Sequence, residues 1–211
     1  MCSLISGIAI HDCWGSYWNY PNIQHAVCCA HLLRELTGIK ENYPEQKWAS
    51  AFIDLLLEMK KVKDKAIEKG KESLSENHYQ KFDKKYDELI EQARKENPLP
   101  ETTEKKRGRK KKGKILALVE RLANYKAPVC LFIYNFHVPF DNNQAERDIR
   151  MIKVKTKVSG CFRTKEGARD YLKIMSYIGT AHKQGYNAYE AIKNAISGNP
   201  DFIFETVSKS V

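Results

Sequence analysis

The sequence lacks the features that would place a protein in a membrane or in an oxidising compartment. Its apolar N-terminal segment, residues 1–10, is too short to span a bilayer and has no basic start of the kind that a signal peptide needs. Its six cysteines show no spacing typical of a disulfide framework. We therefore expect a cytoplasmic protein with reduced cysteines and no membrane partner.

The sequence also lacks an acidic surplus. Lysine and arginine number 36 against 26 acidic residues, which gives a formal net charge of +10. Such a balance favours a polyanionic partner, nucleic acid before an acidic membrane surface, although a merely basic soluble protein would show it too. The length of 211 residues suggests one domain, or one domain with a large insertion.

No internal repeat is visible, and the first half of the chain divides into two zones. Residues 4–10 and 23–29 have the short apolar runs of buried strands, and a helix is expected directly after the second of them. Residues 44–97 have apolar side chains at helical spacing between charged ones. This second zone predicts a helical hairpin or a small bundle.

The second half begins with a basic run and continues with helices. Residues 98–114 show no hydrophobic period, so we expect a mobile basic loop there. Residues 129–134 are apolar and fit either a strand or a helix. Asp141 can cap a helix, with Gln144 placed as in a capping box. Further helices are expected over 115–125, 165–184 and 188–196.

Two acidic residues stand where chemistry is often found. Asp12 follows a predicted strand, and Glu146 lies in the first turn of a predicted helix. DNA phosphoryl transfer commonly uses divalent metals held by carboxylates that the fold brings together from distant parts of a chain. Taken singly, however, each residue has an ordinary structural explanation, Asp12 as a turn residue and Glu146 as a partner of the helix dipole.

Three sequence motifs, in order along the chain, add a resemblance to a known family. The segment HDCWGSY (11–17) resembles the region around the second catalytic aspartate of the insertion sequence 66 family of transposases. The segment HAVCCAHLLREL (25–36), with its Cys28-x-x-His31 pair, resembles the strand and helix that follow. The segment PFDNNQAERDIR (139–150), together with 153–157 and SGCFR (159–163), resembles the C-terminal signature of that family.

The resemblance implies an α/β fold with a ribonuclease H-like core, a mixed sheet flanked by helices, and a helical insertion. Residues 1–36 and 115–211 would form the core, and 37–114 the insertion with its basic loop. Asp12 would be the second aspartate of an Asp-Asp-Glu triad and Glu146 its glutamate, with Mg²⁺ or Mn²⁺ as the cofactor. The implied reaction is hydrolysis at transposon ends followed by strand transfer into target DNA.

The sequence departs from the family pattern at the first triad aspartate. Eleven residues precede Asp12, and none of them is acidic. We therefore expect a truncated core that lacks its first strands and does not cut DNA alone. Two alternatives stay open: a non-catalytic DNA-binding protein that regulates a full-length transposase, and a helical interaction module built on 44–97. A truncated transposase would fit a homo-oligomer or a complex with a full-length transposase. We would expect such a protein to be associated with the nucleoid.

Several further residues are candidates for binding. A basic cluster follows Glu146 and is expected to clamp DNA phosphates, although a solvated basic face is the alternative. Its members are Arg147, Arg150, Lys153, Lys155, Lys157 and Arg163. Arg107 and Arg109 resemble a minor-groove hook, but a solvated linker explains them better.

Two other groups have a structural and a functional interpretation. Trp14, Tyr17, Trp18 and Tyr20 could stack on unpaired bases, although core packing is the commoner role of such residues. Cys28 and His31 have half of a zinc-site spacing. We do not expect zinc, because a structural zinc site normally needs four ligands. The resemblance suggests instead that the pair supports the core near Asp12.

Overall fold

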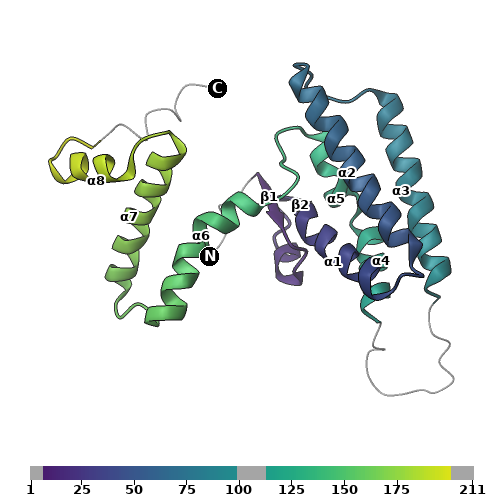
Figure 1. Ribbon diagram of the computed structural model, residues 1–211, viewed down its shortest axis with the longest axis horizontal. Helices are drawn as coiled ribbons and strands as arrows, with labels where there is room; N and C mark the ends of the chain where they lie inside the picture. Colours follow the sequence, from purple (N-terminus) through teal and green to yellow (C-terminus); the bar gives the residue numbers. More distant parts are fainter. Residues whose placement is uncertain (1–6, 99–112, 201–211) are drawn as a thin grey trace. The chain divides into compact units, whose positions relative to one another are not determined.

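The computed structural model describes residues 7–98 and 113–200, which form two compact units. The first unit is Met1–Asn143 and the second is Gln144–Val211. The elements of the first are β1 (Ile8–His11), the 3₁₀ helix η1 (Gly15–Asn19), β2 (Gln24–Val27), α1 (Cys29–Asn42), α2 (Lys47–Glu68), α3 (Glu76–Glu96), α4 (Lys114–Asn124) and α5 (Lys126–Tyr134). From the junction onward follow α6 (Asn143–Ser159), α7 (Lys165–Lys183) and α8 (Ala188–Ile196) (Figure 1).

Both predicted strands are present and pair with each other in parallel. In the register of the pair, Ile8 lies opposite Gln24 and His11 opposite Val27. The residues that the structure describes contain no third strand in this sheet. Because the strands are parallel, their carboxyl ends meet at one edge, where Asp12 and Cys28 follow the last residues of the two strands.

The predicted helical hairpin is confirmed as α2 and α3, two long helices that lie side by side (Figure 1). Their facing sides bury large side chains, among them Trp48, Phe52 and Phe82. The ring of Tyr86 packs edge-on against Phe52, with 4.8 Å between centroids, and its hydroxyl donates to the carbonyl of Leu122 in α4. These contacts give the first unit a continuous core that also includes α1, α4 and α5.

Residues 129–134, for which the sequence left strand and helix open, belong to helix α5. Val129, Cys130, Phe132 and Ile133 are all buried, and the helix packs against β2 and α2. A helix buried on most sides shows no apolar stripe, which explains why the sequence pattern could not separate it from a strand.

The second unit consists of helices with little buried surface of its own. Thr164 caps α7 by accepting from the N–H of Gly167, and Asn187 caps α8 in the same way. Among the described residues of this unit, only Ala181 and Ala191 are buried. The Tyr177 hydroxyl donates to the carbonyl of Ala191 and ties α7 to α8.

The sequence and the structure agree on the α/β class and on the positions of the elements. Most of the basic loop expected over residues 98–114 falls on 99–112, outside the residues that the structure describes, but its last residue, Lys114, is the first residue of α4 and not part of a loop. None of the described helices combines the length and the apolar character needed to cross a bilayer.

Candidate active site

Asp12 lies in a sharp turn directly after β1. Its side chain is exposed, and its Oδ1 atom accepts a hydrogen bond of 3.1 Å from the backbone N–H of Trp14. Cys13, between them, has a φ of 68°, which is in the left-handed region that non-glycine residues rarely adopt. The turn therefore presents a carboxylate at the carboxyl edge of the parallel pair, a usual place for ligand-binding groups in α/β proteins.

Two histidines of the sheet lie next to this turn, and one of them, His11, bonds to it. His11 is 4% exposed, and its Nε2 atom lies 3.0 Å from Nδ1 of His25. The backbone N–H of Cys13 donates to Nδ1 of His11 at 3.1 Å, and Nε2 of His25 lies 3.1 Å from the carbonyl oxygen of Tyr20. Burial, followed by the proximity of His25, lowers the pKa of His11. His11 is therefore neutral at physiological pH.

The histidine pair was not among the site residues predicted from the sequence. Each predicted strand contains one histidine, but whether the two share a face depends on the pairing register. Only the structure supplies that register, which places Ala9 opposite His25 and His11 opposite Val27. The available signal was the position of His11 immediately before a candidate catalytic aspartate.

A distant segment, 138–142, is fixed to the same edge. The carbonyl of Phe140 accepts from the N–H of Cys29 at 3.0 Å. The N–H of Asn142 donates to Sγ of Cys28 at 3.2 Å, and the Asn142 side-chain amide donates to the carbonyl of Ile10 at 3.3 Å. The segment that leads into α6 is thus bonded to Ile10 of β1, two residues before Asp12 in the sequence.

Helix α2 holds the same segment from the other side. The Nζ atom of Lys63 donates to the carbonyl of Val138 at 2.6 Å, and the two residues are 4% and 3% exposed. The ammonium lies 5.6 Å from the centroid of the Phe136 ring. Burial lowers the pKa of Lys63. A residue of the predicted insertion therefore fixes the path of the chain toward Glu146.

Cys28 and His31 lie at the start of α1, at this edge. Cys28 is fully buried at the N-cap position, and its carbonyl accepts from the N–H of His31 at 3.1 Å. Burial raises the pKa of Cys13, in the turn after β1, to about 11, so that this thiol is protonated at neutral pH.

Glu146 lies in the first turn of α6, as expected from the sequence. Asp141 lies two residues before the helix, and its Oδ1 accepts from the N–H of Asn143, the first residue of the helix, at 3.0 Å, which makes a turn in place of the predicted capping box. The Gln144 side chain donates to Asp148 and accepts from Arg147. Asp12 belongs to the first unit and Glu146 to the second, three residues past the junction.

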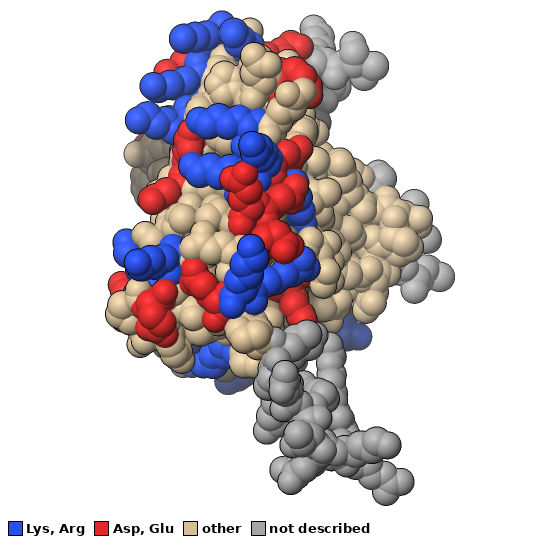
Figure 2. All heavy atoms as spheres, turned by 90° about the vertical axis from the view of Figure 1, so that its right-hand side faces the viewer, with Lys and Arg blue, Asp and Glu red and all other residues tan. Residues whose placement is uncertain are grey.

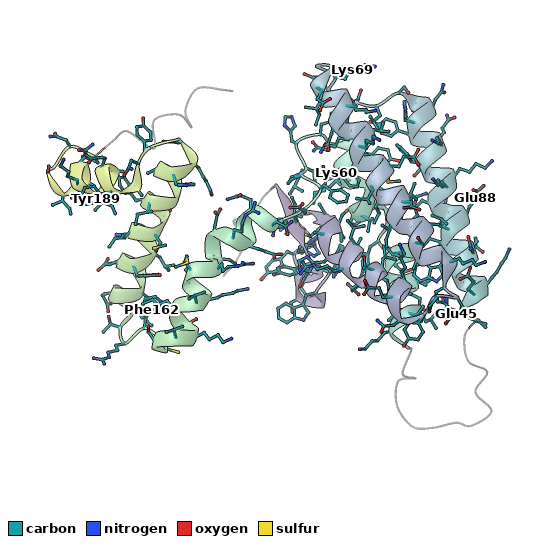
Figure 3. The ribbon with its side chains drawn as sticks, in the orientation of Figure 1. Glu45, Lys60, Lys69, Glu88, Phe162 and Tyr189 are labelled. Carbon is teal, nitrogen blue, oxygen red and sulfur yellow. The ribbon has the colours of Figure 1, made fainter. Side chains whose placement is uncertain are left out.

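The predicted basic cluster divides into two groups on α6. Arg150, Lys153 and Lys157 are exposed and follow Glu146 at intervals of four, three and four residues, which places all four on one helix face. Lys155 points elsewhere: its Nζ lies 3.9 Å from the centroid of the Phe162 ring and 5.5 Å from that of Tyr171 in α7. Figure 3 shows Phe162 at the connection between the two helices.

The remaining two predicted DNA contacts are exposed as well. Arg147 follows Glu146 directly, and Arg163 lies just before α7. The face of the first unit that bears α3 is different: there lysines, arginines and acidic residues alternate (Figure 2). Lys81 and Lys85 both pair with Glu58, and Arg94 pairs with Glu91. Mixed pairs of this kind make a solvated surface with little attraction for a polyanion.

Comparison with known proteins adds a family. The family model described as Transposase IS66 family matches residues 1–170, which include both candidate carboxylates, the Cys28–His31 pair and the basic face of α6. Neither a curated protein nor a solved structure matches the chain. Because the family model covers most of the sequence, the chain belongs to the IS66 family of transposases.

Proposed function

We propose that this chain forms part of the active site of a metal-dependent DNA transposase, with Asp12 and Glu146 as two of its carboxylates. The anchoring of residues 140–142 beside Asp12 carries the proposal. Glu146 follows Asn142 by four residues, a chain length of at most about 14 Å. This short connection permits the carboxylate at the strand edge and the one in the first turn of α6 to bind a common ion, which is what we propose.

The residues at this edge fit a hard divalent cation. Mg²⁺ and Mn²⁺ prefer carboxylate, amide and water oxygens, which is what Asp12 and its neighbour Asn142 offer. When bound, such an ion activates the attacking oxygen and stabilises the leaving oxygen of a phosphoryl transfer. The Trp14 N–H holds one oxygen of Asp12 in place, so that the carboxylate is oriented before any ligand binds.

The exposed basic face of α6 is proposed to hold the DNA strand. Arg150, Lys153 and Lys157 extend from Glu146 over eleven residues of helix, or about 16 Å. Side chains in this arrangement contact successive phosphates and position the strand without reading its sequence. Arg147 and Arg163 add to the same field. Lys155, whose ammonium lies against two rings, is assigned to holding α6 and α7 together instead.

The parallel pair and its covering helices are proposed to be part of a ribonuclease H-like core. The support is the family membership and the position of Asp12 at the carboxyl end of a parallel strand.

The metal site can be tested with matched variants and Mn²⁺ titration followed by electron paramagnetic resonance. Asp12→Asn should weaken Mn²⁺ binding, whereas Asp54→Asn, at an exposed aspartate of α2, should not. Glu146→Gln should act like Asp12→Asn, and Glu166→Gln, in the first turn of α7, should act like the wild type. Equal behaviour of each variant and its control would refute the site.

A strand-cleavage assay tests the proposed role of the two carboxylates. With Mg²⁺ or Mn²⁺ and DNA that contains transposon ends, Asp12→Asn and Glu146→Gln should each abolish any cutting, whereas Asp54→Asn should not. Cutting that survives either of the first two substitutions would contradict the proposal.

The exposed basic face favours a second candidate function, a non-catalytic DNA-binding protein that regulates a transposase. In that case Glu146→Gln leaves every measured property of the DNA complex unchanged, with or without Mn²⁺. A metal-dependent gain in affinity that Glu146→Gln removes would instead support the active-site proposal.

A further inference from the structure

The hydrogen bonds through His11 and His25 have a fixed direction. The backbone N–H of Cys13 can only donate, so Nδ1 of His11 must accept and bears no hydrogen. The carbonyl of Tyr20 can only accept, so Nε2 of His25 must bear a hydrogen. The two ends of the chain of bonds are therefore determined by backbone groups.

The ends determine the bond in the middle. A ring that bears no hydrogen on Nδ1 must bear one on Nε2, so His11 donates to Nδ1 of His25 across the 3.0 Å contact. His25 then accepts on Nδ1 and donates on Nε2. The series runs from Cys13 to His11, to His25 and to Tyr20, and each ring nitrogen is used once.

This series ends on the turn that carries Asp12. Cys13 has a φ of 68°, a conformation that a non-glycine residue keeps only when its surroundings impose it. The bond from its N–H to His11 fixes one side of the turn, and the bond from the Trp14 N–H to Asp12 fixes the other. His25 does not bond to the turn itself; it holds the ring of His11 in the plane that the Cys13 bond requires.

Aromatic side chains enclose the pair. Tyr17 stacks on the His11 ring with 4.7 Å between centroids, and Trp18 meets that ring edge-on at 4.8 Å. Trp18 in turn stacks on Tyr125 at 4.1 Å. Because His11 is only 4% exposed, water cannot easily replace a hydrogen-bond partner that His11 loses.

From this geometry we infer that His25 is a positioning residue, which orients the Asp12 carboxylate through His11 and the Cys13 turn. The inference rests on the proposed function only in taking Asp12 as a metal ligand. Partners behind a metal ligand commonly change metal affinity by about 10- to 100-fold when they are removed. His25 would act on Asp12 in this manner although it lies on the other strand.

The test compares two substitutions of His25 in the 211-residue chain. His25→Leu removes the acceptor for the His11 Nε2–H. His25→Asn keeps it, because the asparagine Oδ1 can occupy the place of Nδ1. Hydrogen exchange by nuclear magnetic resonance reads the turn directly: the amides of Cys13 and Trp14 should exchange at least about tenfold faster in His25→Leu and near the wild-type rate in His25→Asn. The amide of Leu55, in the core of α2, is the control and should not change.

Mn²⁺ affinity measures whether a change in the turn also changes metal binding by Asp12. His25→Leu should lose about tenfold, in the direction of Asp12→Asn, and His25→Asn should stay within about threefold of the wild type. If Asp12→Asn binds Mn²⁺ like the wild type, the metal role of Asp12 fails, and the amide exchange alone decides whether His25 orders the turn. Unchanged exchange at Cys13 and Trp14 in His25→Leu, or equal effects of the two substitutions, would overturn the inference.

Discussion

The two units of this protein differ in how they bury apolar side chains. In the first, Trp48, Phe52 and Tyr86 are fully buried between helices, and the Tyr86 hydroxyl joins α3 to α4 by a hydrogen bond. In the second, Ala181 and Ala191 are the buried residues among those described, while Val158 and Ile196 are 79% and 83% exposed. The first unit has a continuous buried core. The described residues of the second unit are mostly exposed, and several of its charged side chains follow the candidate catalytic glutamate on α6.

The largest expected effect is on the core of the first unit. Phe52→Ala should lower the free energy of unfolding by about 3–5 kcal/mol, because it leaves a cavity against Tyr86 and Trp48. Ile149→Ala on α6, where the side chain is 47% exposed, should cost less than about 1 kcal/mol. Urea unfolding is followed by tryptophan fluorescence for Phe52→Ala, because Trp14, Trp18 and Trp48 all belong to the first unit, and by circular dichroism of the helices for Ile149→Ala. Similar losses for the two variants would remove the distinction between the units.

The next effect concerns the charges of the second unit. If Lys153 and Lys157 each contact a phosphate, replacing both with alanine should reduce the slope of log K against log salt concentration by about 1.8. Lys155→Ala is the matched control on the same helix and should leave the slope unchanged, since its ammonium lies against Phe162 and Tyr171. Fluorescence anisotropy with a short duplex measures all three slopes. A drop of equal size for Lys155→Ala would contradict the assignment of α6 faces.

A smaller effect is expected from the contact that joins α6 to α7. Phe162→Leu removes the ring beneath the Lys155 ammonium and the ring contact with Tyr171. The loss should be about 0.5–1 kcal/mol, as for other partly exposed cation–π contacts. Circular dichroism should record it as earlier melting of helix, while tryptophan fluorescence of the first unit stays constant. A shift of the fluorescence transition instead would show that the two units unfold together.

The smallest effect is a pH dependence in the first unit. Burial lowers the pKa of His11 below its ordinary value of 6.5, so the folded state favours the neutral ring. As the pH falls through 6.5, the unfolded chain takes up a proton that the folded chain does not, and stability decreases until the folded pKa is reached. His11→Asn, which keeps an acceptor for Cys13, should show a weaker decrease in urea midpoint between pH 7.5 and 5. An equal decrease would assign the effect to other groups.

The sequence predicted elements better than it predicted contacts. The apolar spacing of Trp48, Phe52 and Leu55 identified α2, because one face of the helix is buried and the other is charged. The spacing left residues 129–134 of α5 open between strand and helix. A helix buried on most sides has no alternation of apolar and polar residues from which its type could be predicted. Both β-strands overlap the predicted runs, with β1 ending one residue later at His11, but their parallel register is a property of the fold and cannot be read from either strand alone.

The candidate site shows the same limit. Asp12 and Glu146 were recognised through the motifs around them, and their positions after β1 and at the start of α6 match the expectation. The histidine series depends on register, and Lys63 reaches Val138 from a helix far away in sequence, so neither could be inferred from local pattern. The sequence also could not show that the Phe162 ring lies beside the Lys155 ammonium, which the prediction had grouped with its basic neighbours.

The most direct test of the central claim is a double-variant cycle of Mn²⁺ affinity. Asp12→Asn and Glu146→Gln should each weaken binding, and the double variant should be little weaker than either, because groups that share one site are not additive. That result would join a residue of the first unit and a residue of the second in one metal site. Independent, additive losses, or wild-type affinity in either single variant, would show that Asp12 and Glu146 do not bind a common ion.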